Sequence, residues 1–169
     1  MNDSYVELLV KRRNSLAAMI GRNILIGVGT LSLILTVLSG MNFILFIITA
    51  LIYGFAYVCH MQIYTEYEYL CLAKTFSVDK ISNRSRRKKL AEYGLENMEI
   101  LAPASSHRLD QYNGRGDIKT VDYTSKTEGA PVYAMVIKNG NVLTRLLIEM
   151  NEEMLKQLRM TSPRKVFED

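Results

Sequence analysis

Residues 23–65 read NILIGVGTLSLILTVLSGMNFILFIITALIYGFAYVCHMQIYT and carry no formal charge at neutral pH. As a single helix, these residues (about 43) would extend roughly 65 Å, more than twice the ~30 Å hydrocarbon core of a bilayer. Small and turn-prone residues interrupt the apolar run at positions 39–42. The stretch therefore predicts two membrane-spanning helices, Leu16–Leu38 and Phe43–Met61, joined by a tight turn.

The charges around this stretch predict how it crosses the cell membrane. Basic residues precede or open the first span, and the turn between the spans carries no charge. Basic flanks stay on the cytoplasmic side, so we expect both termini to be cytoplasmic. The residues expected to set this topology are Lys11, Arg12, Arg13 and Arg22. The alternative, a buried hairpin in a soluble protein, would need more chain than remains to cover so much apolar surface.

Small residues recur at three- and four-residue spacings within the two spans. Small side chains let membrane helices approach closely. They predict that the two spans pack on each other, with a homodimer face as the alternative. The residues concerned are Gly29, Ser32, Thr36, Gly40, Ala50 and Gly54.

The chain on either side of the hairpin has a different character. Residues 1–15 combine a capping-box pattern with a basic end, which predicts a short basic interfacial helix. Residues 63–169 alternate polar and apolar side chains, and this pattern predicts about seven short strands. Asn139-Gly140 between two apolar runs is a strong hairpin signal. Asn151 can then cap a C-terminal amphipathic helix.

This order of elements resembles the pleckstrin-homology-like (PH-like) fold. More closely, the chain is similar to the small two-span membrane proteins of Firmicutes that carry a bacterial PH-like domain. The resemblance lies in YTEYEYLCL (64–72), in VDKISNRSRRKKLAEYGLENMEIL (78–101), and in the terminal hairpin and helix. It implies an α+β membrane protein: a transmembrane hairpin over 16–62, followed by a cytoplasmic PH-like β-barrel of antiparallel strands closed by a helix.

A basic cluster stands out in the β-rich part: Arg84, Arg86, Arg87, Lys88 and Lys89. Near a membrane, each such residue can add about 1 kcal/mol of attraction to anionic lipid headgroups. By the resemblance, lipid-binding PH domains use basic residues of an early strand–loop region, which is where this cluster falls. The alternative is a solvated basic loop that only reinforces topology. We do not expect nucleic-acid binding, because no aromatic platform accompanies the charges.

Motifs of catalysis are absent from the sequence. It contains no zinc-protease, paired-cysteine, phosphate-loop or serine-hydrolase pattern, and its two histidines, His60 and His107, lie far apart. We therefore expect no enzyme activity, no metal and no cofactor. The sequence predicts a membrane-anchored interaction or scaffold protein, whose partner would be the bilayer, an anionic lipid, another membrane protein or itself. The alternative is an accessory or regulatory subunit of a larger membrane complex.

Overall fold

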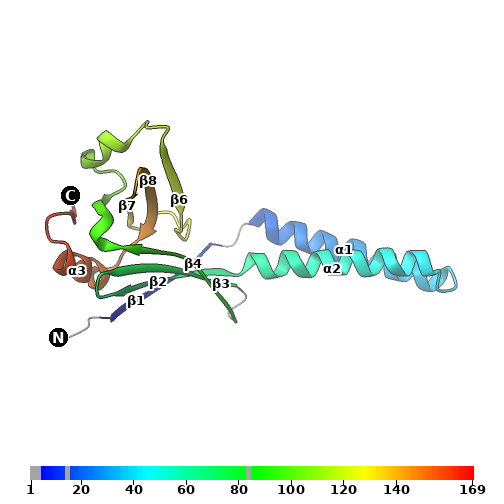
Figure 1. The fold of residues 1–169 in the computed structure, drawn as a ribbon. Coiled ribbons are helices and arrows are strands. Elements are labelled where there is room, and N and C mark those ends of the chain that lie inside the picture. Colours follow the sequence, from blue (N-terminus) through cyan, green and yellow to red (C-terminus); the bar gives the residue numbers. More distant parts are fainter. Residues whose placement is uncertain (1–4, 14–15, 83–84) are drawn as a thin grey trace. The chain divides into compact units, whose positions relative to one another are not determined.

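The structure is a computed structural model that describes residues 5–13, 16–82 and 85–169. The chain divides into two compact units (Figure 1). We call Asn14–Thr65 with Ser82–Ser85 the hairpin unit. The remaining segments, Met1–Arg13, Glu66–Ile81 and Arg86–Asp169, form the sheet unit.

Two long helices, α1 (Leu16–Leu38) and α2 (Phe43–Ile63), make up the hairpin unit. The helix α1 has the ends predicted for the first span, and α2 starts where the second span was predicted to start. Gly40 and Met41 take positive φ angles of 70° and 61° in the turn between them. Asn42 caps α2, because its side chain accepts a hydrogen bond from the Ile44 N–H at 3.0 Å. Both helices are long and apolar enough to cross a bilayer.

The first sheet contains a strand that the sequence did not predict. Its order is β1 (Tyr5–Lys11), β2 (Thr65–Leu72), β3 (Thr75–Ser82) and β4 (Arg86–Gly94). The predicted interfacial helix over 1–15 is therefore wrong for the residues that the structure describes. Val6 and Val10 point into the core with period two, and β1 pairs antiparallel with β2 along its whole length. The tertiary pairing overrides the local capping-box signal, whose Ser4 lies outside the described residues.

The second sheet corrects the expected all-antiparallel barrel. Its order is β5 (Met98–Pro103), β7 (Val132–Asn139), β8 (Val142–Glu149) and β6 (Ile118–Asp122). The β6–β8 pair is parallel. The described residues thus form two four-stranded sheets, eight strands in total, and not a clear single barrel of seven antiparallel strands. The seven strands predicted after the hairpin are all present. Gly140 has a φ of 60° in the turn between β7 and β8, where the hairpin was predicted.

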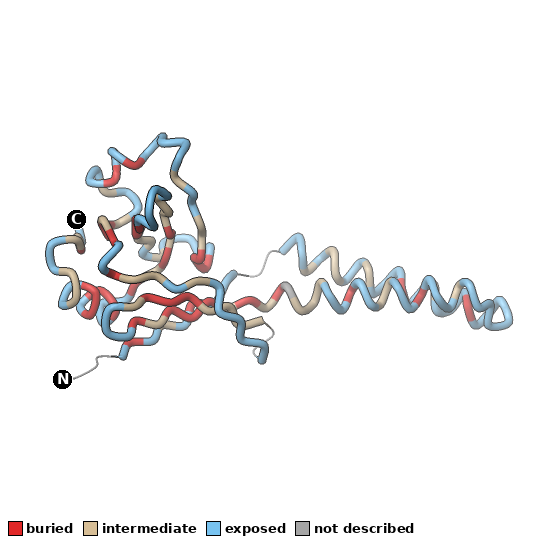
Figure 2. Tube along the Cα trace, viewed as in Figure 1, coloured by how far each residue is buried: buried red, intermediate tan, exposed pale blue. Residues whose placement is uncertain are grey.

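The core of the sheet unit lies between its sheets and α3 (Glu152–Thr161). Asn151 caps α3 as predicted, since its side chain accepts from the Met154 N–H at 2.8 Å. Figure 2 shows that most buried positions belong to the sheet unit, whereas most of the hairpin unit is exposed. The short helices η1 (Leu95–Asn97) and η2 (His107–Tyr112) complete the fold. Large core side chains that are fully buried include Tyr69, Phe76, Leu101, Met135, Ile137, Leu146, Ile148 and Leu158.

Candidate functional site

Strand β4, one of the two edge strands of the first sheet, begins with four consecutive basic residues. We predicted that this cluster would occupy a loop and the start of a strand, but Arg86, Arg87, Lys88 and Lys89 all lie on β4; Arg84 is outside the described residues. Successive side chains of a strand point to opposite faces. The extended backbone therefore divides the cluster into two pairs, and it does not form one cationic patch.

Arg87 is held by carboxylates of two other strands of the same sheet, β2 and β3. Its Nε donates to Asp79 Oδ2 at 2.7 Å, and its guanidinium forms an ion pair with Glu68. The Glu68 side chain is only 6% exposed, and Glu7 lies beside it. Burial, together with the hydrogen bond to Glu7, raises the pKa of Glu68, against the opposing effect of Arg87. Arg87 thus stabilises a buried carboxylate.

The other three basic residues of β4 differ in their ion pairs. Lys89 forms an ion pair with Glu92 on the same strand. Among the residues that the structure describes, Arg86 and Lys88 form no ion pair. Charged side chains on an outermost strand discourage unwanted pairing with other chains. Lipid binding by the cluster stays a prediction beside this structural role of the residues on β4.

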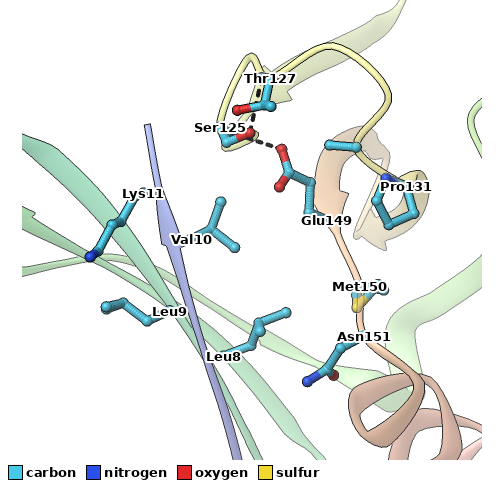
Figure 3. A pocket seen from close by; sticks show the side chains of 11 residues that line it. Leu8, Leu9, Val10, Lys11, Ser125, Thr127, Pro131, Glu149, Met150 and Asn151 are labelled. Carbon is cyan, nitrogen blue, oxygen red and sulfur yellow. Dashed lines mark hydrogen bonds between the residues drawn. The ribbon is translucent and has the colours of Figure 1, made fainter. Parts of the chain in front are cut away.

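A groove of about 350 Å³ lies beside β1 (Figure 3). Four consecutive β1 residues, Leu8 to Lys11, line it. Since alternate side chains of a strand point to opposite faces, a cavity lined by consecutive residues faces the edge of the strand. β1 pairs with β2 on one side only, and its other edge meets no further strand among the described residues. The remaining lining residues are Ser125, Thr127, Ala130, Pro131, Glu149, Met150 and Asn151.

Hydrogen bonds hold the wall opposite β1 in place. Glu149 Oε1 accepts from the Ser125 N–H at 2.6 Å, and Ser125 Oγ accepts from the Thr127 N–H at 3.0 Å. The Arg13 N–H donates to the Ser125 carbonyl at 2.6 Å. Lys126, between these residues, has a φ of 63°. The groove therefore has a fixed wall on one side and strand backbone on the other. This groove could not be predicted from the sequence, because residues 5–11 were predicted to be helical.

The predicted packing residues of the hairpin unit fall into two groups. Gly29 and Thr36 are buried, and an added Cβ at Gly29 would lie 3.3 Å from the Tyr53 ring. Ser32 Oγ lies 2.7 Å from Thr49 Oγ1 on the other helix.

Ala50 and Gly54 are exposed and are wrong as packing residues within the hairpin. Thr49 and Ala56 are buried instead, so the inward face of α2 contains residues seven apart and not the predicted pair four apart. Gly40 lies in the turn, where its positive φ, and not close approach, explains the glycine.

The residues expected to set topology have specific contacts. Lys11 ends β1, and Arg12 Nη1 donates to the Tyr67 hydroxyl at 2.9 Å. Arg13 lies 3.9 Å from Glu128. Arg22 is on α1, where its Nη1 lies 3.1 Å from His60 Nδ1. Among the described residues, no group of three or more His, Cys, Asp or Glu side chains is placed to hold a metal ion.

One protein family matches the sequence of both units. The family described as bacterial PH-like domain (DUF6106) matches residues 2–168. The chain belongs to this family. The bacterial PH-like match runs through β1, the hairpin unit and the sheet unit, so the two apolar helices are inserted between the first and second strands of the matched region. No curated protein and no solved structure matches the chain.

Proposed function

We propose that the chain is a non-enzymatic, membrane-anchored interaction protein. In this proposal the hairpin unit crosses the cell membrane twice, and the sheet unit binds an extended segment of another protein along the free edge of β1. The observation that carries the proposal is the groove beside that edge, which four consecutive strand residues line.

The exposed surface of the hairpin unit supports a membrane location. Within the spanning windows of α1 and α2, only 6% and 11% of the residues are buried. Large apolar side chains such as Leu35 and Phe55 are 48% and 61% exposed. Exposing apolar area to water costs about 25 cal/mol per Å², and hydrocarbon removes that cost. A soluble core helix would instead be mostly buried. The basic residues before α1 favour cytoplasmic termini.

Binding of an extended segment follows from the geometry of the groove. Four strand residues span about 13 Å, so a segment of similar length can lie alongside them. A peptide added to a free strand edge gains main-chain hydrogen bonds, and pockets for its side chains give selectivity. Leu8 and Val10 provide an apolar wall, while Lys11 and Glu149 provide charges of both signs. Recognition of an anionic lipid by β4 has weaker support, because Arg87 and Lys89 are already paired with carboxylates.

A photoreactive amino acid placed in the groove tests this function. Leu9 lines the groove and is 44% exposed, whereas Leu90 is 39% exposed on β4, away from the groove. We expect the Leu9 variant, irradiated in cells, to crosslink to a defined protein and the Leu90 variant to give no such product. The groove proposal would be wrong if the two positions gave the same products. It would also be wrong if a Leu9 product formed equally well after Leu8→Arg narrowed the groove.

A further inference from the structure

We propose that one anionic phospholipid binds between α1 and α2, with its phosphate at Arg22 and His60 and part of an acyl chain against Ile26, Tyr53, Ala56 and Tyr57. These six residues line a groove of about 460 Å³ that belongs entirely to the hairpin unit. This inference rests on the membrane-spanning hairpin of the proposed function. It concerns a different surface from the groove beside β1.

Arg22 and His60 lie at the same end of the hairpin. Arg22 is six residues after the start of α1 and His60 is three residues before the end of α2. At 1.5 Å per residue, they are about 9 Å and 5 Å from those helix ends. In a spanning hairpin this depth is close to the phosphate level of the leaflet.

The two side chains offer hydrogen-bond donors and a positive charge with no anionic partner. Arg22 Nη1 lies 3.1 Å from His60 Nδ1, and Arg22 Nη2 donates to Asn23 Oδ1 at 2.8 Å. Since a guanidinium can only donate, His60 Nδ1 is the acceptor, and the ring proton is on Nε2. Among the described residues no carboxylate forms an ion pair with Arg22.

Neighbouring groups hold both donors in position. The His60 ring packs edge-on against Tyr64, with 5.3 Å between the ring centroids. Asn23 fixes the guanidinium from the other side through contacts to both Nε and Nη2. Among the described residues, the second N–H of Arg22 Nη1, the second N–H of Arg22 Nη2 and the His60 Nε2–H remain to donate to a ligand. A phosphate oxygen matches these donors, because it accepts several hydrogen bonds and carries the opposite charge.

The rest of the groove is apolar and leads away from the charged end. Ile26 lies about one turn further along α1, and Tyr53 about two turns before His60 on α2. The Tyr53 hydroxyl is paired with Thr30 at 3.1 Å, which leaves its ring as an apolar wall. A ligand that fits both parts has an anionic head and about 10 Å of apolar tail. Basic pockets between membrane helices bind anionic lipids in this way.

The experiment measures the phospholipid that the full-length protein retains. Wild type, Arg22→Gln, Ile26→Trp and the control Arg86→Gln are reconstituted in nanodiscs of phosphatidylglycerol and phosphatidylcholine, extracted in mild detergent and examined by native mass spectrometry. We expect wild type and Arg86→Gln to retain one phosphatidylglycerol. Arg22→Gln removes the guanidinium that binds the lipid phosphate, and Ile26→Trp fills the groove. Retention of phosphatidylglycerol should therefore fall at least about tenfold in both variants. Added inorganic phosphate should not displace the lipid.

Three results would overturn the lipid site: equal retention by Arg22→Gln, undiminished retention by Ile26→Trp, or displacement by inorganic phosphate alone. Extraction of the membranes with alkaline carbonate separates this failure from failure of the proposed function. If wild type stays in the membrane and the variants retain as much lipid as wild type, only the lipid site is contradicted. A wild-type protein that carbonate releases contradicts the spanning hairpin, and the lipid site with it.

Discussion

Lys11, the last residue of β1, lies directly opposite Glu66 near the start of β2. The chain therefore leaves the sheet unit at one strand and re-enters it at the neighbouring strand. Four residues separate Lys11 from the start of α1, so the chain can reach about 17 Å between them. Antiparallel pairing of β1 with β2 thus requires the start of α1 and the end of α2 to be close to each other. A hairpin that crosses a membrane under this constraint must cross it an even number of times.

The first prediction follows from this pairing. Ser39→Cys in the exposed turn should react with a membrane-impermeant thiol reagent added to intact cells, whereas Lys119→Cys on β6 should react only after permeabilisation. Serine at 39 is preferred over Asn42, because Asn42 caps α2. If Lys119→Cys were labelled in intact cells and Ser39→Cys were protected, the orientation would be the opposite of the one predicted. The number of crossings would still be even.

The second prediction concerns Cys71, which is fully buried in β2. Burial raises the pKa of its thiol to about 11. The thiolate is the reactive form, so at pH 8 only about one thiol in a thousand would be ionised even if reagent could reach it. In a Cys59→Ser background, we expect maleimide modification to be at least about 100-fold slower in native protein than in urea. Rapid modification without denaturant would show that β2 is open. Cys71 thus reports unfolding of the sheet unit in the intact chain.

The third prediction uses this readout on Arg87. Arg87→Met removes the cation that faces Glu68 and Asp79, and it leaves a buried carboxylate without its counter-charge. We expect the urea midpoint for Cys71 exposure to fall by about 0.5 M. Arg86→Met is the matched control, since Arg86 is on the opposite face of the same strand and forms no ion pair among the described residues. Equal midpoints for the two variants would mean that the ion pairs add nothing to stability.

The fourth prediction is the pH dependence of Glu68. Its pKa is raised in the folded protein, so the folded state binds this proton more tightly than the unfolded state. The resulting stabilisation is complete below the ordinary value of 4.5 and is lost as the pH rises through the raised pKa. Glu68→Gln should therefore gain stability relative to the wild-type protein as the pH rises from 4 to 7. An unchanged difference across this range would contradict the raised pKa.

Much of the fold could be predicted from local patterns in the sequence. The uncharged run gave both helices, alternation gave the seven strands after them, and Asn139-Gly140 and Asn151 gave a turn and a helix cap. Strand β1 could not be found in this way. Its partner lies more than fifty residues away, beyond the hairpin, and a seven-residue segment with a capping pattern gives similar helix and strand signals.

The site was harder to predict for the same reason. The groove exists because β1 is the outermost strand, which depends on long-range pairing. The basic cluster was visible as charge, but the opposing Glu68 and Asp79 come from two other strands, and their contact with Arg87 depends on strand register. Small-residue spacing found Gly29 and Thr36 on α1 but misplaced the inward face of α2. Residue types therefore identified candidates, and the pairing of distant strands decided their roles.

The last prediction tests the helix contact at Gly29. A Cβ at this position would lie 3.3 Å from both Ile52 Cγ2 and the Tyr53 ring, whereas a Cβ at Gly27 on the same helix meets nothing within 4 Å. Gly29→Ile should therefore push α1 and α2 apart, at a cost of about 1–3 kcal/mol, and Gly27→Ile should not.

Cysteines at Ser32 and Thr49 provide the measurement, because their hydroxyl oxygens lie 2.7 Å apart across the two helices. Disulfide formation requires Cβ atoms about 4 Å apart and is sensitive to small separations. We expect this pair to oxidise readily in the parent and in Gly27→Ile, and to lose more than about half of its disulfide yield in Gly29→Ile. Equal yields in all three proteins would mean that Gly29 does not set the approach of the helices.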